Sequence, residues 1–336
     1  MPTLEEIAKL AHVSRSTVSR VINDDPDVRE ATRRRVQRVI DELGFQPNRA
    51  ARSLAGGRMR ILGLVIPRGV ARLFADPYFS VLIEGVTAAC DVRDYSLMLW
   101  LIEANDEQRM TNQILHGGLV DGLLITSALP SDFMVQALED DQVPYVLVGQ
   151  HPKKECGYCV DIDNASSARE AVLHLLRLGH KRVAAIHGSD STRVGLERRW
   201  GYLEALQLRG LTPLPVFQVE ADFTEIGGYY AARRLLQVSP DAIFAASDAM
   251  AIGALRAIRE AGLRVPEDVA VVGFDDMPFA AHADPPLTTI RQPIQHLGSL
   301  AAEMLIERIE NPQMAPRRVI LPTELVVRAS CGMNLS

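Results

Sequence analysis

Beyond residue 60, the chain alternates short apolar runs with longer amphipathic segments. The first apolar run is ILGLVI at residues 61–66, and a helical pattern follows at residues 78–93. The alternation then predicts strands at 95–102, 121–126 and 145–148 and helices at 107–116 and 131–140. Apolar strands separated by helices of this length indicate a parallel sheet that is covered on both faces.

A second series of the same kind begins near residue 164. Its predicted helices are 165–178, 196–209, 225–238 and 249–261, and its predicted strands are 182–186, 216–219, 242–246 and 269–274. The fold class predicted for this part is therefore α/β, with two doubly wound parallel-sheet subdomains in tandem. Ligands of such folds bind in the cleft, beyond the carboxyl ends of the strands.

Residues 1–46 have a different pattern, with three short helices. Thr3 can cap a first helix, in which apolar residues recur at helical spacing, and Ser14 can cap a second helix at 15–23. A third helix is predicted at about 30–43, and Gly44 ends it. Two short helices joined by a tight turn and braced by a third form a helix-turn-helix module, whose second helix enters the DNA major groove.

Between the two parts lies the segment PNRAARSLAGG, residues 47–57. Asn48 can cap a short helix, and the glycine pair ends it. A helix of this length is not stable alone in water. Two arginines and no acid indicate that a polyanion orders it, while a solvated linker is the alternative.

The charge distribution differs between the two parts. The net charge is -6, yet residues 1–60 hold 12 Lys and Arg against eight Asp and Glu, so they carry +4 and the remainder carries -10. A basic head on an acidic body favours a polyanionic partner at the N-terminal part only. Arg15 and Arg20 can each pair with guanine, and Ser14, Thr17 and Asn23 can reach phosphates. A three-helix bundle with a solvated charged face is the alternative.

Other classes of function lack support in the sequence. Charged residues interrupt the N-terminus and no run approaches a membrane span, so we expect a soluble, cytoplasmic protein. Cys156 and Cys159 are the only cysteines at metal or redox spacing, with no second pair to complete a zinc site. We find no phosphate-binding loop, dinucleotide motif, metalloprotease motif or nucleophile elbow. We therefore expect no enzyme activity, no cofactor and no metal.

Three motifs at the N-terminus carry a resemblance. TLEEIA at 3–8, VSRSTVSRVIN at 13–23 and GFQPNRAARSLA at 44–55 resemble the DNA-binding end of the lac and gal repressor family of bacterial regulators. His12 departs from the glycine usual in that turn, and we expect a small stability cost there. The resemblance implies that Leu54 wedges into the minor groove and that Arg15, Ser16 and Arg20 read base edges. The phosphate contacts that it implies are Thr3, Ser14, Thr17, Asn23, Thr32 and Asn48.

The larger part resembles the same family and the periplasmic sugar-binding proteins. The motifs are LGHKRV at 178–183, SDAMAIGA at 247–254, VPEDVAVVGFD at 265–275 and LTTIRQP at 287–293. Polar side chains that hold hydroxyl groups beside an aromatic face suit a sugar. The effector-binding residues that the resemblance implies are Tyr78, Phe79, Gln150, Arg198, Phe223, Ser247 and Asp275.

Each of these residues has an ordinary structural alternative. Tyr78 and Phe223 can be core aromatics, Asp275 can cap a loop, and Arg198 can be a surface helix charge. We expect a helix-turn-helix domain at 1–46, a hinge and linker at 47–60 and an effector-binding and dimerisation core at 61–336. Within the core, we assign about 61–162 and 291–322 to one subdomain and about 163–290 and 323–336 to the other.

These observations predict a sequence-specific transcription regulator that binds double-stranded, palindromic operator DNA as a homodimer. We expect a repressor that a small carbohydrate effector releases. A nucleobase-like corepressor would reverse the sign of regulation and is the alternative within this class. A sugar receptor without DNA function explains the larger part equally well but gives no role to residues 1–57. A cleft hydrolase or isomerase needs an acid and base pair that we do not find.

Overall fold

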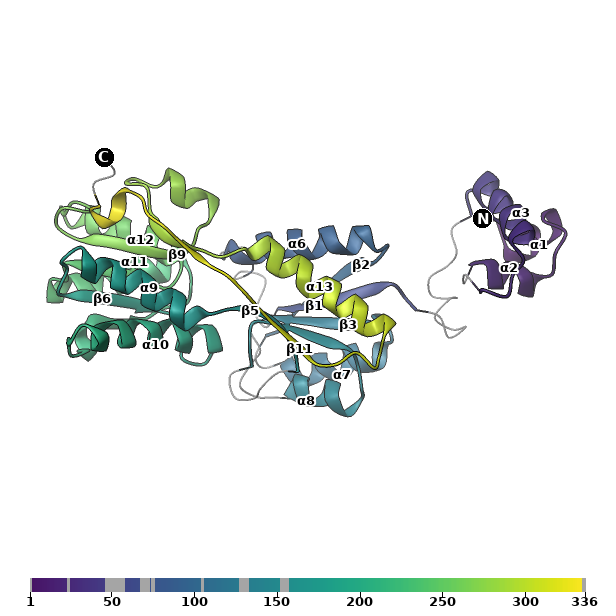
Figure 1. Ribbon diagram of the computed structural model, residues 1–336, viewed down its shortest axis with the longest axis horizontal. Helices are drawn as coiled ribbons and strands as arrows, with labels where there is room; N and C mark the ends of the chain where they lie inside the picture. Colours follow the sequence, from purple (N-terminus) through teal and green to yellow (C-terminus); the bar gives the residue numbers. More distant parts are fainter. Residues whose placement is uncertain are drawn as a thin grey trace. The chain divides into compact units, whose positions relative to one another are not determined.

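The computed structural model describes residues 2–22, 25–45, 58–66, 73, 76–103, 106–126, 133–151 and 157–333. The chain divides into two compact units, Met1–Arg60 and Ile61–Ser336, which we call the module and the body (Figure 1). Three predicted DNA contacts, Asn23, Asn48 and Leu54, lie outside the described residues, as does most of the predicted hinge.

The described part of the module contains three helices, α1 (Leu4–Leu10), α2 (Arg15–Ile22) and α3 (Glu30–Leu43), which confirm the predicted helix-turn-helix class. Their core is small and apolar, and Ile7, Ala11, Val18 and Val36 are fully buried in it. Because the buried positions recur at helical spacing, each helix presents one apolar stripe to the others.

Local hydrogen bonds fix where these helices begin and end. The Thr3 hydroxyl accepts from the Glu6 amide at 3.3 Å while the Glu6 carboxylate accepts from the Thr3 amide at 2.9 Å, which is a capping box. His12 has a φ of 50° in the turn after α1, so it occupies the left-handed conformation that usually favours glycine. Gly44 ends α3 with a φ of 57°.

The body has two lobes, each built on a six-stranded sheet. In the N-lobe, the strand order is β11-β5-β4-β3-β1-β2 and all neighbours are parallel. Helices α6 and α13 pack together on one face of this sheet, and α7 and α8 lie on the other (Figure 1). The elements are β1 (Ile61–Ile66), α6 (Tyr78–Val92), β2 (Ser96–Leu101), α7 (Glu107–Gly117), β3 (Gly122–Thr126), α8 (Phe133–Asp140), β4 (Tyr145–Val148), β5 (Tyr158–Ile162), α13 (Ile294–Glu310) and β11 (Arg317–Leu321).

The C-lobe has the strand order β12-β10-β9-β8-β6-β7, and only the β10–β12 pair is antiparallel among its described strands. Helices α9 and α10 pack against each other, as do α11 and α12. The elements are α9 (Asn164–Arg177), β6 (Val183–His187), α10 (Arg193–Leu208), β7 (Gln218–Glu220), α11 (Glu225–Leu235), β8 (Ala242–Ala245), α12 (Asp248–Glu260), β9 (Ala270–Asp275), β10 (Thr288–Arg291) and β12 (Glu324–Val326), with 3-10 turns at Pro215–Phe217, Leu236–Val238, Pro278–His282 and Ala329–Cys331.

Within residues 157–333, the chain crosses between the lobes three times: between β5 and α9, between β10 and α13, and between β11 and β12. The α/β class predicted for this part is confirmed. The hydrophobic pattern does not predict five of the elements beside these crossings, namely β5, β10, α13, β11 and β12. Near residue 216 the predicted strand is wrong in its bounds, because Pro215 begins a 3-10 turn and the strand starts only at Gln218.

Candidate functional site

One pocket of the body collects residues from the carboxyl ends of strands in both lobes. The space between its walls, with the solvent at its mouth, is about 770 Å³, within the size range of small-molecule sites. β4 and β5 approach it from the N-lobe, and β9 approaches it from the C-lobe. All seven side chains predicted for the effector site line this pocket: Tyr78, Phe79, Gln150, Arg198, Phe223, Ser247 and Asp275.

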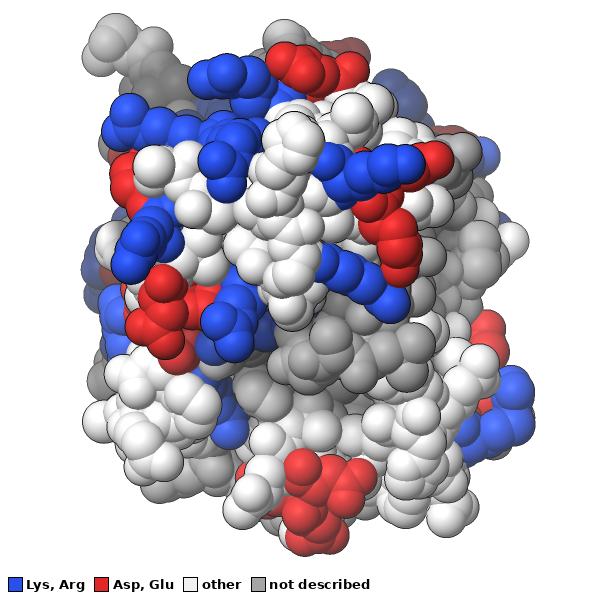
Figure 2. Space-filling view, turned by 90° about the vertical axis from the view of Figure 1, so that its right-hand side faces the viewer, with Lys and Arg blue, Asp and Glu red and all other residues white. Residues whose placement is uncertain are grey.

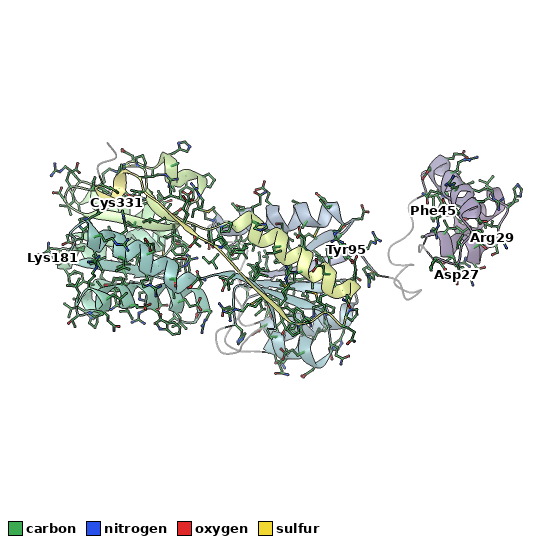
Figure 3. The ribbon with its side chains drawn as sticks, in the orientation of Figure 1. Asp27, Arg29, Phe45, Tyr95, Lys181 and Cys331 are labelled. Carbon is green, nitrogen blue, oxygen red and sulfur yellow. The ribbon has the colours of Figure 1, made fainter. Side chains whose placement is uncertain are left out.

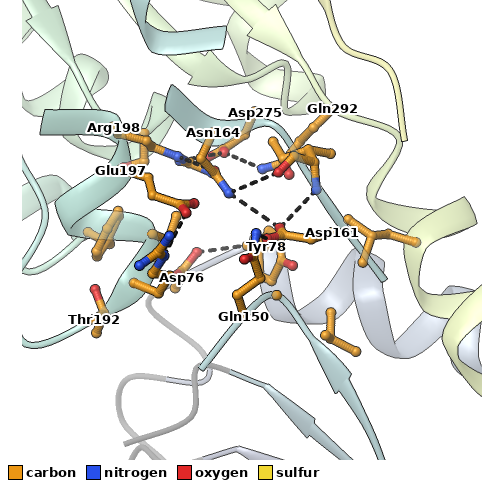
Figure 4. A pocket seen from close by; sticks show the side chains of 18 of the residues that line it. Asp76, Tyr78, Gln150, Asp161, Asn164, Thr192, Glu197, Arg198, Asp275 and Gln292 are labelled. Atoms are coloured by element: carbon orange, nitrogen blue, oxygen red, sulfur yellow. Dashed lines mark hydrogen bonds and ion pairs between the residues drawn. The ribbon is translucent and has the colours of Figure 1, made fainter. Parts of the chain in front are cut away.

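Arg198 is the centre of a buried polar cluster (Figure 4). Its Nε donates to Asn164 Oδ1 at 3.0 Å, and its Nη1 donates to the Ala246 carbonyl at 2.6 Å and to Asp275 Oδ1 at 3.2 Å. The guanidinium also lies 3.6 Å from the centroid of the Phe274 ring. Since Arg198 is only 4% exposed, the alternative of a surface helix charge is wrong.

Asp275 holds the other end of this cluster. It is the last residue of the apolar strand β9 and accepts a second hydrogen bond, from Gln292 Nε2, at 2.6 Å. Burial raises the pKa of Asp275 to about 7, although the charge of Arg198 acts in the opposite direction. The carboxyl group is therefore poised between its neutral and ionised forms near neutral pH, and a ligand can bias it either way.

A second carboxylate, Asp161, faces the pocket from the end of β5. Its Oδ2 accepts from Gln150 Nε2 at 2.9 Å, and Arg318 Nη2 donates to Gln150 Oε1 at 2.9 Å. Burial raises the pKa of Asp161 to about 6, while the hydrogen bond from Gln150 lowers it. Gln150 thus has both amide atoms engaged by protein groups, so its first role in this structure is to orient Asp161.

Aromatic rings form part of the pocket wall. Tyr78 and Phe79 begin α6, with their rings edge to face at a centroid distance of 5.5 Å. Burial, and next the charge of Asp161, raise the pKa of Tyr78 well above its ordinary value. Phe223 has a φ of 65° and packs on Gly188, where an added Cβ would stand 2.0 Å from the ring. Tyr78 and Phe223 therefore fit both the core-aromatic alternative and the predicted place in the effector pocket, since each packs against the core and lines the pocket.

Ser247 closes the C-lobe side of the pocket as the N-cap of α12, where its hydroxyl accepts from the Met250 amide at 3.2 Å. Seven further polar residues of the pocket were not predicted from the sequence. Asp161 lies in β5 and Gln292 follows β10, two strands that the hydrophobic pattern misses, so neither residue lies at the end of a predicted strand. The other five precede a helix or lie in its first two turns: Asp76, Asn164, Thr192, Arg193 and Glu197.

The candidate DNA contacts of the module lie on and beside α2. Arg15, Ser16, Arg20, Ser14 and Thr3 are exposed, and Thr17 and Thr32 are half-buried. Ser14 Oγ lies 2.7 Å from Ser16 Oγ and 2.8 Å from Thr17 Oγ1, which gathers three hydroxyl groups at the start of α2. A helix N-terminus with exposed hydroxyls and arginines matches the chemistry of phosphate and base contacts.

The arginines of α2 are held only loosely. Exposed Arg15 Nε lies 3.2 Å from exposed Glu5 Oε1, and exposed Arg20 Nε lies 3.7 Å from Oδ2 of the half-buried Asp25. Such exposed pairs contribute little stability and separate readily. One face of the molecule, in Figure 2, shows blue Lys and Arg side chains gathered in its upper half with smaller red groups between them.

Cys90, Cys159 and Cys331 lie in the described part of the chain. Cys159 and Cys331 are buried, and Cys331 is labelled in the C-lobe in Figure 3. Its Sγ lies 3.3 Å from His174 Nε2. Cys156 lies outside the described residues. Within the described ranges, no three His, Cys, Asp or Glu side chains are placed to hold a metal ion. No helix in these ranges has the length and apolar character needed to span a bilayer.

A helix-turn-helix module joined to a two-lobed binding body defines a transcription regulator that responds to a small molecule. Residues 3–48 match the model for bacterial regulatory proteins of the lacI family, and residues 172–331 match the model for a periplasmic binding protein-like domain. The HTH-type transcriptional regulator CelR of Thermobifida fusca is 42% identical over 334 residues, 98% of each chain. The chain belongs to the lacI family of bacterial regulatory proteins.

Other relatives also match this chain over almost its whole length. The ribose operon repressor of Escherichia coli (strain K12) is 38% identical over 98% of this chain and 100% of its own. A solved complex of the transcriptional regulator CelR with cellobiose has a TM-score of 0.78 at 40% identity, covering 98% of this chain and 100% of that one. The lac repressor dimer bound to operator and the anti-inducer ONPF has a TM-score of 0.84 at 29% identity, covering 98% and 99%.

Proposed function

We propose that this regulator is a repressor that binds a palindromic operator as a homodimer and is released by a small carbohydrate. The observation that carries the proposal is the pocket cluster of Arg198, Asn164, Asp275 and Gln292 beside the aromatic wall of Tyr78 and Phe223. Planar and charged hydrogen-bonding groups suit the vicinal hydroxyls of a sugar, and an aromatic ring suits its apolar face. Relatives solved with cellobiose or named for the ribose operon support this class of effector.

DNA recognition is assigned to the module. Arg15, Ser16 and Arg20 read base edges from α2, and Thr3, Ser14, Thr17 and Thr32 contact phosphates. Asn23, Asn48 and the minor-groove wedge Leu54 belong to the same proposal, although they lie outside the described residues. One recognition helix covers one half-site, so tight binding needs two copies of the chain. The solved lac repressor dimer on its operator supports this arrangement. DNA as the partner also places the protein in the cytoplasm.

The effector acts by coupling the two sites. A sugar held by both lobes favours one arrangement of the lobes over another, and that arrangement changes how residues 47–60 of the two protomers present their modules. Leu54→Ala then weakens operator binding and leaves sugar binding intact. If the same variant lost sugar binding to an equal extent, the wedge role would be wrong.

The experiment that tests the function selects duplexes from a random DNA pool with the purified protein. The selection is repeated with cellobiose, ribose, other mono- and disaccharides, and purines. A palindrome whose binding a sugar weakens is the expected result. Tightening by a purine would reverse the sign of regulation, and selection of no sequence would remove the DNA-binding assignment.

A further inference from the structure

Glu197 lies in the pocket without a role in the cluster around Arg198. It stands in the second turn of α10, and its side chain points toward the space beside Tyr78 and Asp76 (Figure 4). Its Oε1 accepts from Arg193 Nε at 2.6 Å. Its Oε2 is buried and has no hydrogen-bond partner among the residues that the structure describes. The residue is 7% exposed, so bulk water does not solvate this oxygen freely.

A buried carboxylate oxygen without a donor is costly, because the group has lost water and gained nothing in return. The hydrogen bond from Arg193 Nε to Oε1 fixes the orientation of the Glu197 side chain. Arg193 is itself held, since its guanidinium lies 5.4 Å from the centroid of the Trp200 ring. The pair therefore presents one preset acceptor to whatever occupies the pocket.

The remaining polar groups of the pocket favour the same kind of ligand. Asp76, Asp161 and Asp275 line it together with Glu197, against the two guanidiniums of Arg193 and Arg198. Both guanidiniums already donate to protein acceptors. An anionic ligand would meet like charges in a partly desolvated space, whereas a hydroxyl group can donate to a carboxylate.

We propose that Glu197 is a specificity residue of the effector site: its Oε2 accepts a hydrogen bond from a hydroxyl of an uncharged sugar and excludes sugar phosphates and sugar acids. This inference rests on the proposed function, since it names the effector class of the same pocket. Glu197 acts by direct contact with the sugar, and Arg193 is the positioning residue that holds it.

The test measures sugar binding to the full-length protein by calorimetry, with neutral mono- and disaccharides and the monophosphate of each monosaccharide. Glu197→Gln should weaken the neutral sugar about tenfold or more, the loss expected for a hydrogen bond to a charged acceptor. Glu204→Gln is the matched control, because Glu204 lies on the same helix in a surface pair with Arg169. The control should bind the sugar as the wild type does.

Monodeoxy sugars identify the sugar hydroxyl that contacts Glu197. Loss of the hydroxyl that contacts Glu197 should weaken binding to the wild type about tenfold and leave binding to Glu197→Gln unchanged. If every deoxy sugar lost the same affinity in both proteins, Glu197 would not contact the sugar. Equal binding by Glu197→Gln and Glu204→Gln would also overturn the inference.

Binding of the monosaccharide monophosphates tests the inference with the wild-type protein alone. The wild type should bind each neutral monosaccharide at least tenfold more tightly than its monophosphate. A phosphate that binds more tightly than its parent sugar would overturn the inference and keep the carbohydrate function. If no sugar or phosphate bound the wild type at all, the proposed function itself would fail, and the two failures are thus distinguishable.

Discussion

The two regions that carry the candidate sites hold their arginines in opposite ways. In the module, the side chains of Arg15 and Arg20 are 68% and 65% exposed, and each faces one acidic partner at the surface. In the body, the Arg198 side chain is 5% exposed and its hydrogen bonds go to an amide, a carbonyl and a carboxylate. An exposed arginine is free to exchange partners when DNA arrives, whereas the buried one belongs to the structure as much as to the site.

The difference predicts which substitutions affect folding and which affect binding alone. A surface ion pair contributes about 0–1 kcal/mol, but removal of one member of a buried pair costs about 3–5 kcal/mol. The body therefore couples ligand binding to its own stability, and the module does not. Four predictions follow from this contrast, in order of decreasing effect.

Arg198→Ala should lower the free energy of unfolding of the body by about 3–5 kcal/mol, because Asp275 and the Ala246 carbonyl lose a buried donor. Sugar response should disappear while operator binding persists, since the module is a separate compact unit. Chemical denaturation, operator binding and sugar titration measure the three quantities.

The matched control is Arg199→Ala, one residue further along α10. Arg199 donates to Asp190 at 2.6 Å and to Gln218 at 3.1 Å, but its side chain is 33% exposed. We expect a loss of at most about 1 kcal/mol and a normal sugar response. Normal sugar release of the operator by Arg198→Ala would remove Arg198 from the effector site.

Arg15→Ala should weaken binding to the selected operator by about 1–3 kcal/mol and relax the sequence preference at one position of each half-site. The melting temperature of the module should barely change, because only the surface pair with Glu5 is lost. Arg34→Ala on α3 removes a similar exposed arginine that pairs with Glu30. A loss of operator affinity in Arg34→Ala as large as in Arg15→Ala would point to general charge rather than base reading.

The contrast between the regions also explains how much of the fold and of the candidate sites could be predicted from the sequence alone. The module's candidate residues lie on or next to short helices whose caps and apolar spacing are local signals, so Thr3, Ser14 and Gly44 could be placed from neighbouring residues. The body's alternation of strands and helices likewise predicts its fold class. The pocket is different, because Asp161 and Gln292 are 131 positions apart in the chain and meet only through the lobe crossings. No local sequence pattern predicts that these two residues line one pocket, and none predicts the orientation of the Glu197 side chain.

The pH dependence of sugar binding should come next in size. If the sugar is held by ionised Asp275, the affinity for the sugar should rise as pH increases from about 6 to 8, through the Asp275 pKa of about 7. Stability without sugar should change in the opposite direction. The folded-state pKa is raised above the unfolded value, so the contribution of Asp275 to stability is fully present near pH 4 and is lost as pH rises through about 7.

Asp275→Asn tests both slopes at once. It should flatten the pH dependence of sugar affinity above pH 6 and reduce the fall in stability between pH 4 and 7. Asp161, whose pKa burial raises to about 6, should leave a residual slope at lower pH. Calorimetric titrations and urea unfolding at matched ionic strength measure these slopes, and unchanged slopes in Asp275→Asn would exclude this carboxyl group as their source.

The smallest predicted effect comes from a feature that the module and the body share, a glycine at the C-terminus of a helix. Gly44 ends α3 in the module, and Gly118 follows α7 in the body; both have a φ of 57° and no atom within 4 Å of an added Cβ. Alanine at either position should therefore cost about 1 kcal/mol through backbone strain alone. The same free energy should lower the melting temperature by about 4–8 °C in a unit as small as the module and by about 2–4 °C in one as large as the body. Calorimetry of the full chain separates the two transitions, and equal shifts would mean that the module and the body unfold as one cooperative unit.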